Sequence, residues 1–494
     1  MADVKKERNF HSWGVVLAMA VVFFSAGLGA HQFISREAMV YEAVCDQLIA
    51  NTTAGRQALI CSVWWPPLNT LLRLPVTALH LSENNHIASL IVSALSGAAI
   101  LFMLNRILRE WGVGWTRYLL MAGLVLNPLF IRQCFNGSTV TTVSLLVLFS
   151  GWGLAMWLET KQLRYLAFIG AGTAALSLAS FHMTCWALGL LLILSVDQIF
   201  LPSGRKHESE AVLILGWLPI LYSFGTWVLV NWLIMGDAIY FMRSLFSGEE
   251  SANPTIVTGS SLLFQLFIFI MSLVITVPSL IARNTPGTAL GLLGFMSLCA
   301  GGLLSWLGIS WSSPAFLSIC LPLSIAGLGY LWRFNAPSAR RLKPLAVALL
   351  LVVVVLSQIF PRSETARTGD CAETVERDRG IWLPRISSHV LKKSRYSRVF
   401  VCGHRGFLFA RGAGNLLYEH VLDLDTGKIR RDYKGQRIYI LVPAPAGGNV
   451  LDSVYWKYRK VYAGEQGDML YDSDWGDWRL FEIIQAPEKE DNIK

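Results

Sequence analysis

The chain has 494 residues, of which 53% are hydrophobic and only 15% are charged, and its formal net charge is +9. A soluble domain usually carries about a quarter charged residues, so the composition excludes an ordinary soluble protein over most of the length. The positive charge does not indicate a nucleic-acid-binding protein, because most basic residues lie in short segments between apolar stretches, where they follow membrane topology.

The density of charge divides the chain into two parts. The segment 362–494 holds 22 of the 42 Lys and Arg residues and 19 of the 33 Asp and Glu residues, the density of a soluble domain. Its length of about 130 residues is also common for a domain. The sequence therefore predicts a multi-span membrane domain over 1–361 and a soluble domain over 362–494.

The membrane domain contains about eleven apolar stretches, each close to the 20 residues with which a helix crosses a bilayer. Every segment expected on the inner side carries Lys or Arg, which predicts a cytoplasmic N-terminus. An odd number of spans then places the soluble domain outside. The predicted spans are 14–33, 86–104, 117–134, 139–158, 165–180, 183–200, 212–235, 262–281, 288–308, 313–332 and 344–361.

The first outer loop, over 34–85, is the longest outer connection between predicted spans. Its first part, "REAMVYEAVCDQLIA", has apolar residues at helical spacing, with Glu37, Glu42 and Asp46 elsewhere on the helix. This pattern predicts a helix that lies along the membrane surface.

The loop continues with a rigid aromatic stretch, "WWPPLNTLLRLP", over 64–75. Trp64 and Trp65 suit the headgroup layer of a membrane. Pro66 and Pro67 favour the start of a second helix, because proline fits the first turn. We expect this helix to be short, apolar and interfacial.

The soluble domain has the pattern of a mixed α/β fold. "SRVFVCG", "RIYILVP" and "GDWRLFEII" are typical of strands, and "SVYWKYRKVY" favours a helix. An acidic run near the end lacks the EF-hand pattern and is interpreted as a solvated loop. That run consists of Glu465, Asp468, Asp472, Asp474 and Asp477.

Two pairs of cysteines share a segment expected outside the membrane. Cys45 and Cys61 lie in the first outer loop, and Cys371 and Cys402 lie in the soluble domain. Each pair suits a disulfide in an oxidising compartment or a pair of buried free thiols, and both alternatives stay open.

Five arginines lie in outer loops or at outer ends of spans, where topology does not require them: Arg36, Arg56, Arg73, Arg132 and Arg243. Charges near the hydrocarbon are costly and mark function, and guanidinium groups suit bidentate binding of phosphate. The group predicts a pocket for a lipid-linked phosphate that contains at least one or two of them. The alternative for each is contact with lipid headgroups.

Carboxylates and one histidine complete the candidate site. Glu37, just outside the first span, and Glu42 are candidates for a general base, although acids at a helix entry are also common as caps or solvated residues. Asp237 begins the second outer loop, 236–261. His182 lies at the turn between two spans and suits phosphate if protonated, or a packed polar role.

Several short motifs in this order resemble the GT-C superfamily of membrane glycosyltransferases. The closest similarity is to the branch of bacterial protein O-mannosyltransferases and lipid A aminoarabinose transferases. It is carried by "REAMVYEA", by the "PPL" of "WWPPLNTLL", by "NPLFIRQ" with "STVTTVSLLVLF", by the 163–194 hairpin with His182 at its tip, and by "NWLIMGDAIYFMRS". The motifs are scattered over roughly two-thirds of the chain.

The resemblance implies a GT-C-like fold at a bacterial inner membrane, with the soluble domain periplasmic or extracellular. It implies inverting transfer of a sugar from a polyprenyl-phosphate donor to a lipid, glycan or protein acceptor, with Glu37 or Glu42 as the base. No pattern in the sequence requires a nucleotide or a metal. The donor phosphate would be bound by Arg73, Arg132, Arg243 and His182, and the pocket wall would include Trp64, Trp65, Pro66, Pro67 and Asp237.

The sequence departs from the family pattern at its catalytic positions. The family has an Asp-Glu pair in which Asp is the favoured catalytic residue, but here Arg36 precedes Glu37. The second outer turn has no acid, where many relatives have one. The alternative is therefore a non-catalytic relative that binds lipid-linked glycan or helps to assemble an envelope complex. A transporter is disfavoured, because no paired, broken spans recur in two matching halves.

Overall fold

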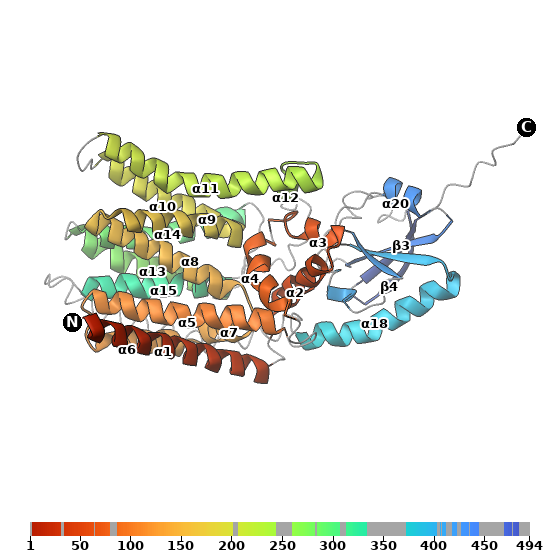
Figure 1. Cartoon of the computed structure of the whole chain (residues 1–494), viewed down its shortest axis with the longest axis horizontal. Coiled ribbons are helices and arrows are strands. Elements are labelled where there is room, and N and C mark those ends of the chain that lie inside the picture. Colours follow the sequence, from red (N-terminus) through yellow and green to blue (C-terminus); the bar gives the residue numbers. More distant parts are fainter. Residues whose placement is uncertain are drawn as a thin grey trace, which may run out of the picture.

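The computed structural model places three parts along the long axis of the molecule (Figure 1). A bundle of long helices carries the N-terminus at its far end, a layer of short helices follows, and a sheet with flanking helices lies beyond that layer. The structure describes residues 2–30, 34–63, 65–79, 86–200, 206–243, 259–281, 284–306, 313–332, 372–402, 406, 408–411, 417–421, 426–433, 435–443, 469–476 and 478–483.

The bundle consists of apolar helices, as the sequence predicts. Within the described residues, four helices are long and apolar enough to cross a membrane, and the bent pair α6–α7 makes up to five. Five further apolar stretches are shorter, and the predicted span 344–361 lies outside the described residues, so the count of eleven stays a prediction. The helices are α1 Ala2–Gly29, α5 Ile87–Glu110, α6 Thr116–Val125, α7 Pro128–Phe135, α8 Val140–Thr160, α9 Leu163–Ala179, α10 Phe181–Phe200, α11 Lys206–Met235, α12 Tyr240–Arg243, α13 Gly259–Ile281, α14 Thr285–Trp306 and α15 Ser313–Trp332.

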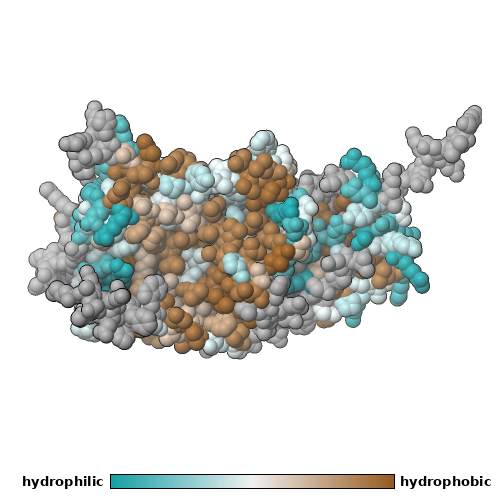
Figure 2. Space-filling model, in the orientation of Figure 1, coloured by the Kyte–Doolittle hydropathy of each residue, from teal (hydrophilic) through white to brown (hydrophobic). Residues whose placement is uncertain are grey.

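The outer surface of the bundle is apolar. Figure 2 shows a broad hydrophobic zone over the long helices and hydrophilic patches at the end that carries the N-terminus and over the sheet. Leu17 of α1, Leu192 of α10 and Leu221 of α11 are among the large apolar side chains that the long helices expose. Water would oppose so large an apolar surface, whereas lipid accommodates it. The chain is a helical membrane protein.

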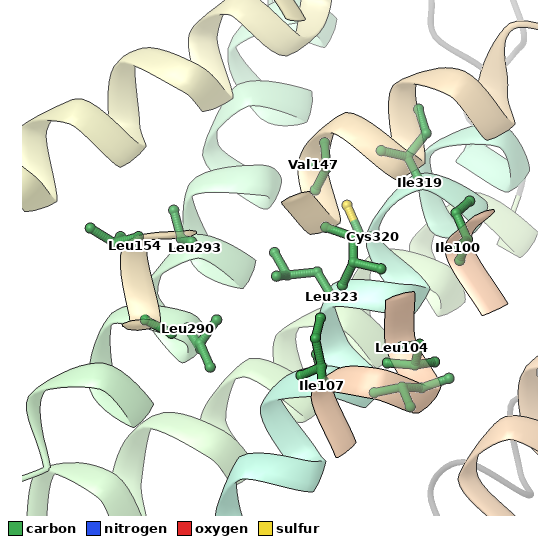
Figure 3. Close-up of a cluster of buried hydrophobic side chains, with 14 of the residues drawn as sticks. Ile100, Leu104, Ile107, Val147, Leu154, Leu290, Leu293, Ile319, Cys320 and Leu323 are labelled. Carbon is green, nitrogen blue, oxygen red and sulfur yellow. The ribbon is translucent and has the colours of Figure 1, made fainter. Parts of the chain in front are cut away.

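The interior of the bundle is built where α5, α8, α14 and α15 meet (Figure 3). Leu104, Val147, Leu293 and Leu323 come from these four helices, and all four side chains are buried. At Gly151 of α8, a Cβ atom would lie 2.5 Å from a methyl group of Leu323, so any larger residue there would have to displace the Leu323 side chain. The helices therefore pack as one core.

The predicted span 117–134 is wrong as a single helix, because α6 and α7 meet at a bend of 66°. Pro128 is the cause, since its ring disfavours a helical conformation at the preceding residue and it has no N–H for the helix ladder. Asn127 then caps the new helix, and its Oδ1 accepts the N–H groups of Leu129 at 2.9 Å and Phe130 at 3.3 Å. The Asn-Pro pair marks the break in the sequence.

The predicted division of 165–200 into two helices is confirmed. α9 ends at Ala179 and α10 begins at Phe181, and Ser180 between them has an extended backbone with φ −158° and ψ 116°. His182 therefore lies in the first turn of α10.

The soluble part is a mixed α/β unit, as predicted. The strand order is β2-β1-β3-β5-β4, in which β1 pairs in parallel with β2 and β3, and β5 pairs antiparallel with β3 and β4. The helix expected at 453–462 lies outside the described residues. The elements are α18 Ala372–Lys393, β1 Ser397–Cys402, β2 Tyr418–Val421, α20 Thr426–Asp432, β3 Arg437–Pro443, β4 Met469–Trp475 and β5 Trp478–Ile483.

Helices cover both faces of this sheet. Ile386 and Val390 of α18 pack with Val399 and Leu441 on one face. Ile429 of α20 packs with the side chains of the other face. Alternating residues of the central strands are therefore buried on both sides, which explains their continuous apolar sequence.

The interpretation of the acidic run as a solvated loop is wrong for Asp472 and Asp474, which lie in strand β4. The side chain of Asp472 is only 8% exposed and accepts hydrogen bonds from Lys393 and from Ser473, the latter at 2.9 Å. His389 of α18 lies 2.8 Å away. Burial would raise the pKa of Asp472, but these partners lower it below the ordinary aspartate value. The carboxylate ties α18 to the edge of the sheet.

Asp472→Asn is expected to destabilise the sheet domain at neutral pH and to have little effect under strongly acidic conditions. A carboxylate with a lowered folded pKa contributes stability above the unfolded aspartate value of about 4, and this contribution is lost as the pH falls below that value. Hydrogen exchange of residues 469–483 in the full chain, at increasing urea concentration, measures the effect. A difference from wild type that is as large at pH 3 as at pH 7 would contradict the assignment.

Candidate active site

A layer of three short helices lies between the bundle and the sheet (Figure 1): α2 Arg36–Ile49, α3 Thr53–Ala58 and α4 Pro67–Thr77. The two helices predicted in this loop are confirmed. Pro66, with φ −63° and ψ 146°, is the residue before α4, and Pro67 occupies its first turn. Ser35 caps α2 by accepting the N–H of Ala38 at 3.2 Å. Residues within one turn therefore determine where both helices begin: proline in the first turn of α4 and a serine cap before α2.

Of the alternatives for Glu42, the solvated acid is wrong. Residues 38–45 are all buried, and Glu42 is only 4% exposed. The reason is that α2 is covered on several sides: α4 of the same layer and α5 of the bundle pack against it, and Leu408 of the sheet domain packs with its apolar residues. α2 is therefore an interior helix between two parts of the molecule.

Glu42 caps the start of α5. One carboxylate oxygen accepts the N–H of Ser89 at 2.8 Å, and the other lies 3.0 Å from Nδ1 of His86. His86 is the residue before α5 and has a left-handed backbone, with φ 49°. Burial would raise the pKa of Glu42, but the His86 ring, the Ser89 N–H and the charge of Arg411 together lower it. A carboxylate at a helix N-terminus is electrostatically favourable, so Glu42 stabilises the start of α5.

Glu37 lies in the first turn of α2, and its half-buried carboxylate faces the turn before α8. Its Oε1 accepts the Thr139 hydroxyl at 2.5 Å. Its Oε2 accepts the Ser138 hydroxyl at 3.3 Å and the Thr139 N–H at 3.4 Å. Three donors from one turn fix the orientation of this carboxylate. Glu37 and Glu42 are five residues apart, so they leave α2 in directions that differ by about 140°.

Arg73 of α4 is completely buried, at 0% exposed. Its guanidinium donates to Ser89 Oγ at 2.9 Å, to the Asn69 carbonyl at 2.8 Å and to the Gly137 carbonyl at 2.8 Å. It also lies over the ring of Tyr41, 4.8 Å from its centre. These partners carry no charge, and they join α4 to α5, to α2 and to the turn that holds Glu37.

A second set of contacts extends the layer to α9. Asn69 Nδ2 donates to the Ala179 carbonyl at 2.7 Å and to the Tyr41 hydroxyl at 3.3 Å. Trp65 packs edge-on against Tyr41, with ring centres 5.1 Å apart. Ala179 ends α9, three residues before His182, so the turn with His182 lies at the edge of the same layer.

The structure brings some predicted site residues together and places others elsewhere. Arg73 links the two glutamates. It donates to Gly137, in the turn that bonds Glu37. It also donates to Ser89, whose N–H bonds Glu42. Arg132 is half-buried in the last turn of α7, and Asp237 caps the turn after α11 through the N–H of Ile239. Arg56 is exposed and donates to Asn51. Trp64 lies outside the described residues, as do the side chains of Arg36 and Arg243.

Sequence reasoning missed Ser138, Thr139, Ser89 and His86, which contact the two carboxylates. The Asn-Gly pair at 136–137 marks a turn, and Gly137 has the left-handed φ of 76° that glycine permits. No local pattern, however, pairs this turn with α2. In the described part of the chain, no cluster of three or more His, Cys, Asp or Glu residues is arranged to hold a metal ion.

Of the two alternatives for Cys45 and Cys61, the structure supports buried thiols rather than a disulfide. The Cys45 thiol instead donates to the Thr70 carbonyl at 3.5 Å. Burial raises the pKa of Cys45 to about 12, so the thiol is unreactive in the folded chain. Cys371 lies outside the described residues, so its pairing with Cys402 stays a prediction.

These features define a class of protein: a polytopic helical membrane protein whose short helices α2, α3 and α4 are enclosed between the bundle and an α/β domain. Two solved structures of ArnT from Cupriavidus metallidurans, one bound to undecaprenyl phosphate and one in the apo state, have this fold. Each has a TM-score of 0.53 and 12% identity, and the alignments cover 96% and 97% of this chain and 99% and 100% of theirs. The fold expected from the sequence resemblance is thus confirmed. No family profile and no curated protein matches the sequence.

Proposed function

We propose that the chain is a membrane glycosyltransferase that transfers a sugar from a polyprenyl-phosphate-linked donor to an envelope acceptor at the outer face of a bacterial inner membrane. The observation that carries the proposal is the fold, which matches a protein solved with undecaprenyl phosphate over nearly its whole length. The architecture supports it, because an amphiphilic donor keeps its tail in lipid while its phosphate lies at the level of the short helices.

In the proposed reaction, an acceptor hydroxyl or amine attacks the anomeric carbon of the donor sugar with inversion. The bond between that carbon and the phosphate oxygen breaks, and the electron pair leaves with the lipid phosphate. Glu37 accepts the proton of the nucleophile, and Ser138 and Thr139 hold its carboxylate in one orientation. General-base catalysis of this kind contributes about 10²- to 10⁴-fold to a rate.

Fixed positive charge would stabilise the departing phosphate. Arg132, Arg243 and His182 are the candidates for direct contact with it. Arg73 would contribute positive charge without contacting the phosphate, because its guanidinium is buried among neutral oxygens. Unchanged donor affinity in Arg132→Ala would remove that residue from the phosphate site. The proposed pocket wall consists of Trp64, Trp65, Pro66, Pro67 and Asp237.

The proposed topology places the N-terminus in the cytoplasm and residues 362–494 outside. It is supported by the positions of the N-terminus and the sheet at opposite ends of the bundle (Figure 1). Membrane-impermeant labelling of a cysteine placed at exposed Tyr396 in intact cells tests this side of the membrane.

A non-catalytic relative that binds lipid-linked glycan is the second candidate. It is favoured by Arg36, which replaces the family Asp, and by the hydrogen bonds that already occupy both oxygens of Glu37 and of Glu42. A glycosyltransferase consumes the donor and forms a product, whereas a non-catalytic relative only binds the lipid-linked glycan. Mass spectrometry of envelope glycans and lipids decides between them: cells that lack the protein should lose a sugar modification, wild type should restore it, and Glu37→Gln should not. Restoration by both Glu37→Gln and Glu42→Gln would favour the binding role.

Thr139→Val is expected to reduce transfer about 3- to 10-fold with little loss of stability, since one hydrogen bond contributes about 1 kcal/mol. The variant keeps the shape of the side chain but removes the donor to Glu37 Oε1. Thr160→Val is the matched control, because Thr160 lies at the other end of α8 and bonds the Met156 carbonyl and the Gln162 N–H rather than Glu37. Equal transfer rates for the two variants would contradict the positioning of Glu37 by Thr139.

A further inference from the structure

The sheet domain contacts α2 through helix α18 and through the short segment 408–411, which follows strand β1. Leu408 is only 3% exposed and packs in one cluster with Ala38, Val40 and Val44 of α2. Arg411 Nη2 forms an ion pair with Asp46 Oδ2 at 2.8 Å, and the two side chains are 17% and 37% exposed. The contact therefore combines a buried apolar side chain with a charge pair at its edge.

The membrane domain also holds α2, through its two glutamates. Glu42 bonds the start of α5, and Glu37 bonds the turn before α8. The charge of Arg411 reaches this region, because it is one of the causes that lower the pKa of Glu42. α2 has 14 residues, and an isolated helix of that length is marginally stable in water, so its position depends on the groups packed against it.

We propose that the sheet domain is a positioning element of the enzyme, and that Leu408 and Arg411 hold α2 so that Glu37 stays in register with Ser138 and Thr139. This role rests on the proposed glycosyltransferase function. It assigns to the soluble domain a task within the same chain, in addition to any recognition of an acceptor. Leu408 and Arg411 are positioning residues, since neither belongs to the proposed donor or acceptor contacts.

The burial of Cys45 provides a readout that is independent of transfer. Cys45 lies on α2 at 0% exposed, and Cys134 on α7 is equally buried at 0%. In the purified full chain, Leu408→Ala and Arg411→Ala should accelerate labelling of Cys45 by a thiol reagent about tenfold, while labelling of Cys134 stays unchanged. The matched controls are Leu391→Ala and Arg395→Ala, which alter exposed side chains of the same domain and should leave Cys45 protected.

The catalytic readout is the division between kcat and KM. Loss of register should lower kcat for Leu408→Ala about tenfold with little change in the KM for donor, because Glu37 acts on the nucleophile rather than on the lipid phosphate. The single variant Asp46→Arg should lower kcat. The double variant Asp46→Arg/Arg411→Asp, which exchanges the two charges, should restore it. A tenfold effect corresponds to about 1.4 kcal/mol.

The possible outcomes separate this inference from the function on which it rests. Unchanged Cys45 labelling in Leu408→Ala and Arg411→Ala overturns the inference, and so does faster labelling with normal kcat. If wild type transfers no sugar from any polyprenyl-phosphate donor, the proposed function is wrong and the positioning role falls with it, although Cys45 labelling still reports whether the domain holds α2.

Discussion

Glu37→Gln is expected to lower sugar transfer by about 10²- to 10⁴-fold, the contribution of a general base. Glutamine keeps the size of the side chain: its carbonyl oxygen can still accept the Ser138 hydroxyl and the Thr139 N–H, and its amide NH2 can donate to the Thr139 hydroxyl, so folding should be retained. Only the ability to take a proton from the acceptor is removed. The measurement is the amount of sugar-modified envelope product, by mass spectrometry, in cells that express the variant at wild-type level.

Glu42→Gln is the matched control for this result. The same chemical change at Glu42 weakens the cap of α5 and removes the charge beside His86, so we expect lower stability and a smaller loss of transfer per folded molecule. Full transfer by both variants would remove the carboxylate-base mechanism. If Glu42→Gln loses transfer while Glu37→Gln keeps it, the general base is Glu42.

Arg73→Ala is expected to destabilise the protein by about 3 kcal/mol or more. The change removes three hydrogen bonds of a charged group and leaves a cavity in a buried layer, and each of these costs free energy. The Gly137 carbonyl would lose its donor in the turn that positions Glu37. The denaturant midpoint of the full chain in mixed micelles measures the effect.

Arg56→Ala is the control for the loss of an arginine in the same layer. Arg56 is exposed and bonds Asn51 only five residues away, so its removal should change the free energy of unfolding by less than about 0.5 kcal/mol. An Arg73→Ala midpoint equal to that of Arg56→Ala, combined with weaker binding of donor, would show that Arg73 is a phosphate ligand rather than a structural cation.

Local chemistry made several elements of this fold predictable. Pro66 and Pro67 indicate the start of α4, because the requirements of proline are met within one turn. Apolar spacing predicts the helix α2, and β-branched runs predict β1 and β3. In each case the deciding interaction lies within the element itself.

The surroundings of these elements could not be predicted from the sequence, because they depend on residues distant in the chain. Glu42 has the spacing of a solvated acid, but Leu408 and the start of α5 enclose its helix. Asp472 lies in a run that looks like a loop, but its partners His389 and Lys393 belong to α18. Periodicity indicates which side of a helix is apolar, but it does not indicate whether another domain covers the polar side.

The candidate site shows the same division. The residue types of a phosphate and carboxylate site are visible in the sequence, and their roles stay proposals. The contacts of Glu37 with the 138–139 turn and of Arg73 with Gly137 span long loops, so only the folded structure reveals them. The burial of Arg73 also could not be inferred, because a lone arginine in an apolar helix suggests contact with headgroups.

The binding of undecaprenyl phosphate to the purified full chain, followed by native mass spectrometry, tests the central claim most directly. The account predicts one bound undecaprenyl phosphate per chain, retained in preference to an anionic phospholipid such as phosphatidylglycerol and weakened by Arg132→Ala. Binding that is no tighter than that of phosphatidylglycerol, and unaffected by this substitution, would contradict a site for a polyprenyl-phosphate donor.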